Sequence, residues 1–113
     1  MGHTRVLYTD STSAECGTVL KMLSFEEDLR TSCYQRLDNP GVKIYIVWGK
    51  ADYYPELLAR IPFPTRVQVH FKTKDRAERL ATVVREAETA LKILDPSCRI
   101  QVFDPATGEE ITF

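Results

Sequence analysis

The sequence predicts one α+β domain over residues 1–113, in which two long helices cover one face of an antiparallel sheet. Three observations predict this class. Two segments repeat apolar residues at the spacing of an amphipathic helix, and four others have the residue types of strands. One strand alternates without a fault, which is typical of a sheet with one face towards water. The apolar content of 43% and the charged content of 27% are those of a folded globular protein.

The chain is expected to begin with a strand and to continue as a helix. A short strand is predicted at residues 5–9, and the polar residues 10–13 offer several N-caps for a helix that starts near Ser13. Ser24, with Glu27 three residues later, forms a second capping box, which predicts a kink or a new helix there. The apolar stripe of this second piece comprises Phe25, Leu29, Cys33 and Leu37.

The middle of the chain predicts a central strand and a connector. Residues 42–48 are the richest strand candidate, and we expect them near the middle of the sheet. Pro55 can open a short helix within residues 49–64, while Pro62 and Pro64 prevent that helix from continuing. The segment is therefore expected to be a connector with a turn or two of helix.

The second half of the chain repeats the order of strand, helix and strand. Residues 66–72 alternate between polar and apolar side chains, and residues 73–94 repeat apolar positions at helical spacing. Residues 99–103 are expected to form the next strand. A turn at residues 104–108 then predicts that residues 110–113 return as a hairpin strand.

This order of elements is that of a ferredoxin-like two-layer sandwich, βαββαβ, with an added C-terminal hairpin strand. Strict alternation in residues 66–72 favours it, because strands covered on both faces are apolar throughout. The alternative is a three-layer α/β fold with a parallel sheet, in which the short helix after Pro55 is a true crossover. Residues 42–48, which are apolar on both sides except at Lys43 and Tyr45, favour that alternative.

Charge and cysteine content narrow the classes of function. The net charge of −1 offers no general attraction to nucleic acid or to anionic membranes. Three cysteines without CxxC spacing argue against a disulfide framework, so a reducing cytoplasm is expected. No stretch approaches the roughly 20 apolar residues of a membrane span, and no signal peptide is recognised. His3 and His70 lack acidic neighbours, so neither a metal nor a cofactor is predicted.

The first candidate site is the junction between the first strand and the first helix. Asp10, Ser11 and Ser13 stand where free N–H groups and the helix dipole can bind an anion, and Cys16 could be an activated thiol. The alternative interpretation is an ordinary helix cap with a buried cysteine. Since no phosphate-loop motif precedes the helix, we expect no catalytic residue and keep a small enzyme or anion binder as an alternative function.

The second candidate site is the polar face of the sheet. It is expected to carry a basic patch with an aromatic side chain: Lys43, Tyr45, Arg66, Gln68, His70, Lys72, Arg99 and Gln101. Such a face can bind single-stranded nucleic acid, although the RNA-recognition signature is absent. The preferred interpretation is a homodimer, in which two copies pair through Leu7, Tyr45, Val47 and Phe103.

The connector is the third candidate site because it concentrates aromatic residues. Trp48 and Phe63 can close one end of the core, which leaves Tyr53 and Tyr54 as contact residues for a protein partner. The sequence thus predicts a small non-catalytic interaction or regulatory module, homodimeric and without a cofactor. The residues predicted to bind the partner are Tyr45, Tyr53, Tyr54, Arg66, Gln68, His70 and Arg99.

Overall fold

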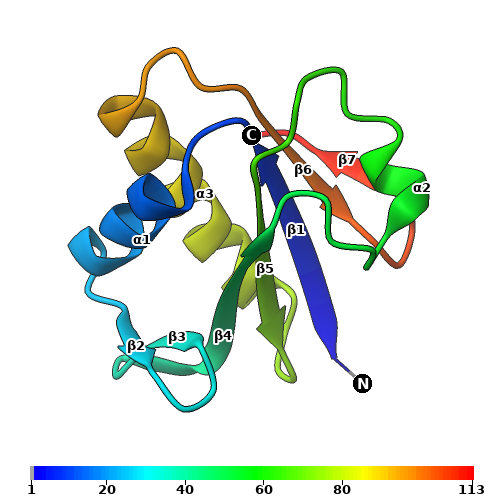
Figure 1. Ribbon diagram of the computed structural model, residues 1–113. Helices are drawn as coiled ribbons and strands as arrows, with labels where there is room; N and C mark the ends of the chain where they lie inside the picture. Colours follow the sequence, from blue (N-terminus) through cyan, green and yellow to red (C-terminus); the bar gives the residue numbers. More distant parts are fainter. Residues whose placement is uncertain (1) are drawn as a thin grey trace.

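A single antiparallel sheet runs through residues 2–113, the part of the chain that the computed structural model describes. Its seven strands lie in the order β2-β3-β4-β5-β1-β6-β7 (Figure 1). The strands are β1 (His3–Thr9), β2 (Glu26–Asp28), β3 (Cys33–Arg36), β4 (Asn39–Trp48), β5 (Val67–Thr73), β6 (Ile100–Asp104) and β7 (Glu109–Ile111). The helices are α1 (Ser13–Met22), α2 (Pro55–Leu58) and α3 (Glu78–Leu94).

The two longer helices lie on one face of the sheet, and the short α2 lies on the other (Figure 1). Strand alternation explains this division, because every second side chain of β1 and β5 points to the α1 and α3 side. The main core between the sheet and these helices is built from Leu7, Val19, Leu20, Ile44, Val69, Phe71, Leu80, Val84 and Leu91. Within residues 2–113, no helix is both long enough and apolar enough to cross a membrane.

The prediction of a ferredoxin-like sandwich is wrong, although the α+β class holds. The sheet has seven strands, and two of them, β2 and β3, replace the predicted second half of the first helix. A connector also covers part of the face that was expected to lie open. The three-layer alternative is wrong as well, because every pair of neighbouring strands is antiparallel.

The helix α1 ends at Met22 because the backbone turns left-handed two residues later, at Ser24, with a φ of 70°. The N–H of Phe25 donates to the carbonyl of Leu20 at 2.9 Å, and the N–H of Ser24 donates to Lys21 at 3.0 Å. This pair of bonds is a Schellman motif, which terminates helices, and it is accompanied by packing of Phe25 and Leu20 in one core. The apparent capping box at Ser24 therefore follows a helix end and does not start a new helix.

The apolar residues predicted to line that second helix recur at every fourth position. The β2–β3 hairpin that forms instead places them alternately in the core and in turns. Phe25 and Cys33 are buried, whereas Leu29 is 84% exposed and Leu37 is 93% exposed. The N–H of Ser32, at a φ of 56°, donates to the carbonyl of Asp28 and closes the turn between β2 and β3. Only the alternate members of the stripe are therefore core residues.

The other elements lie close to their predicted positions. β1, β4, β5 and β6 overlap the four predicted strands, and β7 follows β6 as a hairpin partner. α3 begins at Glu78, five residues later than expected, because Thr73 still pairs with Val42 and His3 in the sheet. The Oγ1 of Thr73 then accepts the N–H of Asp75 at 3.1 Å, which starts the turn into the helix.

Candidate functional site

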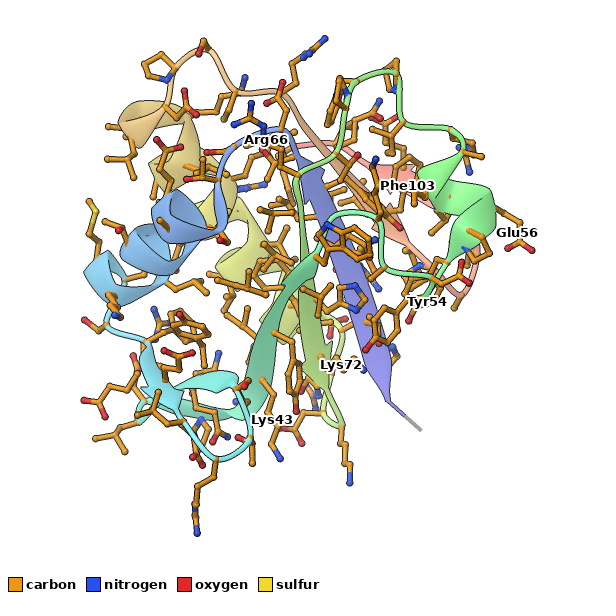
Figure 2. The ribbon with its side chains drawn as sticks, in the orientation of Figure 1. Lys43, Tyr54, Glu56, Arg66, Lys72 and Phe103 are labelled. Carbon is orange, nitrogen blue, oxygen red and sulfur yellow. The ribbon has the colours of Figure 1, made fainter. Side chains whose placement is uncertain are left out.

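The sheet face opposite α1 and α3 divides into two halves. On the covered half, the connector (residues 49–66) lies over β1 and β6, so that Leu57 packs with Val6, Tyr8 and Phe103 in a second apolar cluster. On the open half, Lys43, Tyr45 and Lys72 stand on β4 and β5 without such a cover. Figure 2 shows Phe103 beside the connector and α2, and Lys43 and Lys72 together at one end of their strands.

Gln68 attaches the connector to the sheet at the border between the halves. Its Nε2 donates to the carbonyl oxygens of Gly49 at 3.1 Å and Ala51 at 3.0 Å. The remaining polar atom, Oε1, must then accept a hydrogen from His70 Nε2, which lies 3.0 Å away. Since Gln68 is 1% exposed and His70 is 2% exposed, the prediction that they face water is wrong.

His70 lies among aromatic rings and is held neutral. The ring of Tyr53 contacts it edge-on at 5.0 Å between centroids, and the ring of Tyr54 stacks on it at 5.8 Å. Burial, together with the smaller effect of the nearby charge of Lys72, lowers the pKa of His70 to about 4. At neutral pH this side chain is therefore an uncharged part of the packing under the connector.

The open half holds two lysines that face each other. Lys43 and Lys72 are direct partners in the pairing of β4 with β5, an arrangement that destabilises a sheet by charge repulsion. The Nζ of Lys72 lies 5.6 Å from the ring centroid of Tyr45, which partly offsets that cost through a cation–π contact. Neither lysine forms an ion pair with any carboxylate in the described part of the chain, residues 2–113.

A hollow of about 490 Å³ opens beside this pair, and we call it the lysine cleft. The basic, aromatic and polar side chains that line it include those of His3, Thr4, Lys43, Tyr45, Lys72 and Lys74. Asp75 also borders the cleft, but its carboxylate lies 3.8 Å from the guanidinium of Arg79 and is partly neutralised. The cleft therefore combines excess positive charge with one aromatic ring.

The predicted partner-binding residues are distributed over both halves. Tyr53 is 58% exposed, whereas Tyr45 and Tyr54 are half-buried. Arg66 is exposed but lies at the opposite end of β5 from Lys72 (Figure 2). Arg99 binds the carboxylate of Asp10 at 2.9 Å, so its charge is already paired. Tyr45 is thus the member of the predicted set that lines the lysine cleft.

The junction before α1 has the geometry of an ordinary helix cap. The Oγ1 of Thr12 accepts the N–H of Glu15 at 3.1 Å, and Ser11 bonds to the carboxylates of Glu15 and Asp95. Burial, together with smaller effects of Cys98 and Glu15, raises the pKa of Cys16 to about 12. A neutral thiol and two carboxylates make the alternative of an anion or thiol site at this junction unfavourable.

Two features of the site were missed at the sequence level. Lys74 was not singled out, because it follows the alternating segment, and the pairing of Lys43 with Lys72 depends on a register between distant strands. The cover over His70 had a signal in the sequence, since Leu57, Leu58 and Ile61 make the connector apolar along one side.

No group of three or more potential metal ligands occurs within residues 2–113. Comparison of the chain with protein-family models, with curated proteins and with solved structures gives no match. The interpretation of the lysine cleft therefore depends on its own geometry and charge.

Proposed function

We propose that the protein is a non-catalytic binding module that holds single-stranded nucleic acid on the open half of the sheet face. The observation that carries the proposal is the opposed pair of Lys43 and Lys72 at the lysine cleft. Two ammonium groups without carboxylate partners favour a phosphate between them, because the ligand would remove their mutual repulsion.

An aromatic ring at the same place favours nucleic acid over a simple anion. Tyr45 lies beside both lysines, and bases of a single strand can stack on such a ring without regard to sequence. A paired duplex does not present the faces of its bases in this way. The cleft volume of about 490 Å³ lies within the range of roughly 300–1,000 Å³ that is typical of small-ligand sites, so one nucleotide fits.

Tyr53 offers a second stacking position next to the first. Its ring contacts His70 at 5.0 Å, and His70 is the cross-strand partner of Tyr45. His70 therefore lies between Tyr45 of the lysine cleft and Tyr53 of the connector. This arrangement supports a ligand of more than one nucleotide, with phosphates at the lysines and a further base at Tyr53.

Fluorescence anisotropy with a labelled eight-nucleotide single strand tests the proposal. We expect Lys72→Gln to weaken binding about tenfold, since one phosphate contact is lost. The slope of the logarithm of the binding constant against the logarithm of the salt concentration is expected to decrease in magnitude by about one. The matched control is Lys21→Gln, which removes an exposed lysine from α1 on the other side of the sheet and leaves the affinity unchanged. Equal affinity of Lys72→Gln and the unchanged protein would contradict the proposal.

Homodimerisation and a cytoplasmic location stay predictions. The three cysteines are free and buried, which suits a reducing compartment. Face-to-face pairing is less favourable than expected, because Leu7 and Phe103 are buried within the chain and the lysine pairs of two copies would approach each other. Light scattering at high concentration distinguishes a dimer from a monomer.

A further inference from the structure

The sheet has a free edge at β2, on the far side of the molecule from β7. β2 pairs with β3 on one side only, so its outward backbone N–H and C=O groups have no strand partner in the sheet. The carbonyl of Asp28 does not belong to this edge, because it accepts the N–H groups of Thr31 and Ser32. Figure 1 shows the β2–β3 hairpin at the end of the sheet, beyond the layer of α1 and α3. Such an edge can accept an extended peptide as an additional strand.

Two exposed leucines and two hollows flank this edge. Leu29, in the turn after β2, is 84% exposed, and Leu37, in the turn after β3, is 93% exposed. Leu29 borders a hollow of about 600 Å³, and Leu37 borders one of about 380 Å³. Ser24 and Glu26 line both hollows, so the two are adjacent along β2. Alternate side chains of an added strand can occupy hollows of this kind.

The charge along this edge determines which partner fits. Glu26 and Glu27 form no ion pair within residues 2–113. Lys21 and Arg36 also border the hollows, but Arg36 already binds Asp38 at 2.7 Å and Glu86 at 3.3 Å. Lys21 offsets one of the two glutamates, and Arg30 binds Asp28 at 3.8 Å, so the edge keeps an excess of one negative charge and complements a basic strand.

A second copy of the chain is a poor occupant of this edge. The other free edge of the sheet, β7, carries Glu109 and Glu110, so pairing of β2 with β7 would bring carboxylates together. Pairing of β2 with β2 of another copy would have the same result. The acidic residues thus block self-association and select a basic partner.

We infer that β2 binds an extended, lysine- or arginine-containing segment of a partner protein by strand addition. The outward backbone groups of β2 supply the hydrogen bonds, and Leu29 and Leu37 supply apolar contacts at the two ends. Glu26 and Glu27 point to opposite faces of the sheet, so each pairs with basic side chains on its own face of the added strand. This surface is separate from the lysine cleft, and its use does not depend on the binding of nucleic acid.

A pair of labelled synthetic peptides tests the inference by fluorescence anisotropy. The first alternates Lys and Val over six residues, and the second alternates Glu and Val. We expect the chain to bind the lysine peptide at least tenfold more tightly than the glutamate peptide. Two lysine peptides, each N-methylated at one of the two alternate sets of residues, complete the series. The peptide whose methyl groups face β2 cannot donate its backbone bonds and is expected to bind as weakly as the glutamate peptide. Equal binding of the methylated and unmethylated peptides overturns strand addition.

Two variants of the chain complete the test. The double variant Glu26→Lys/Glu27→Lys is expected to exchange the preference, so that the glutamate peptide becomes the tighter ligand. The double variant Leu29→Ser/Leu37→Ser is expected to bind the lysine peptide about tenfold less tightly. It is expected to stay folded, because both leucines are outside the core. An unchanged preference in the charge variant, with circular dichroism confirming its fold, overturns the inference. The matched control is Glu56→Lys, at an exposed position of α2 away from β2, which leaves peptide binding unchanged.

Discussion

The covered and open halves of the sheet face differ although one strand contributes to both. His70 and Lys72 lie two residues apart on β5 and point to the same side of the sheet. His70 is 2% exposed under the connector, whereas Lys72 is exposed and faces another lysine. The strand itself does not make this difference. The connector does, because it bonds to Gln68 and buries apolar side chains over one half only.

The comparison shows where stability and binding are located on this face. On the covered half, the buried members of the apolar cluster are uncharged, and the guanidinium of Arg60 lies 4.8 Å from the ring centroid of Phe103. The polar side chains of Gln68 and His70 bond to each other. On the open half, a repulsive lysine pair is retained without a carboxylate partner. We therefore expect substitutions on the covered half to affect the free energy of unfolding, and those on the open half to affect ligand binding.

The largest effect is expected from Phe103→Ala on the covered half. Phe103 is 2% exposed and contacts the ring of Tyr8 edge-on at 6.0 Å between centroids. Loss of a buried aromatic ring costs roughly 3–5 kcal/mol of unfolding free energy. Urea denaturation measures this loss, with Lys50→Ala, at an exposed position, as the control that changes stability by less than about 0.5 kcal/mol. A small effect of Phe103→Ala would mean that the connector does not pack on the sheet.

A pH effect of somewhat smaller size is expected from His70. Its folded pKa of about 4 lies below the ordinary value of 6.5, so the unfolded chain binds the proton more tightly than the folded chain does. The stability that neutral His70 contributes is therefore complete above pH 6.5 and is lost as the pH falls towards 4. The difference in pKa corresponds to about 3 kcal/mol.

Urea denaturation at several pH values measures this contribution. Carboxylates also titrate at the lower end of the range, so the informative quantity is the difference between the unchanged protein and His70→Gln. This difference is expected to decrease between pH 6.5 and pH 4. A difference that is constant with pH would show that His70 is accessible to water and that the two halves are not distinct.

The smallest effect is expected from Lys72→Gln, and it has the opposite sign. Removing one of two directly opposed like charges is expected to stabilise the fold by roughly 0.2–1 kcal/mol. The same variant is expected to bind nucleic acid less tightly, so stability and binding change in opposite directions. Thermal unfolding at low ionic strength measures the gain. Destabilisation by Lys72→Gln would indicate that the lysine is a structural residue.

The elements that were predicted from the sequence are those whose signal is local. The apolar repeat that includes Leu80, Val84 and Leu91 predicts α3, and the alternation of residues 66–72 predicts β5. The spacing of Phe25, Leu29, Cys33 and Leu37 fits both a helix and a hairpin. There the left-handed backbone at Ser24 and Ser32 decides the outcome, and serine gives no advance sign of it.

The candidate site was predicted only in part for a similar reason. Alternation assigns Lys43, His70 and Lys72 correctly to one face, but it does not show what covers that face. Cover depends on the connector, which docks through Gln68 onto the carbonyls of Gly49 and Ala51. Lys43 and Lys72 are 29 positions apart in the sequence, and they stand opposite each other only because of the register between β4 and β5. That register is set by the packing of side chains on both faces of the sheet.

Nuclear magnetic resonance tests most directly whether the open half is the binding surface. Backbone amide shifts of the 15N-labelled chain are followed during titration with an eight-nucleotide single strand. We predict that the largest changes occur at Lys43, Tyr45, Lys72 and Lys74, with Tyr53 next and with Val6 and Phe103 unaffected. Changes that cluster on α1, α3 or β2, or none at the lysine cleft, would contradict the proposed function.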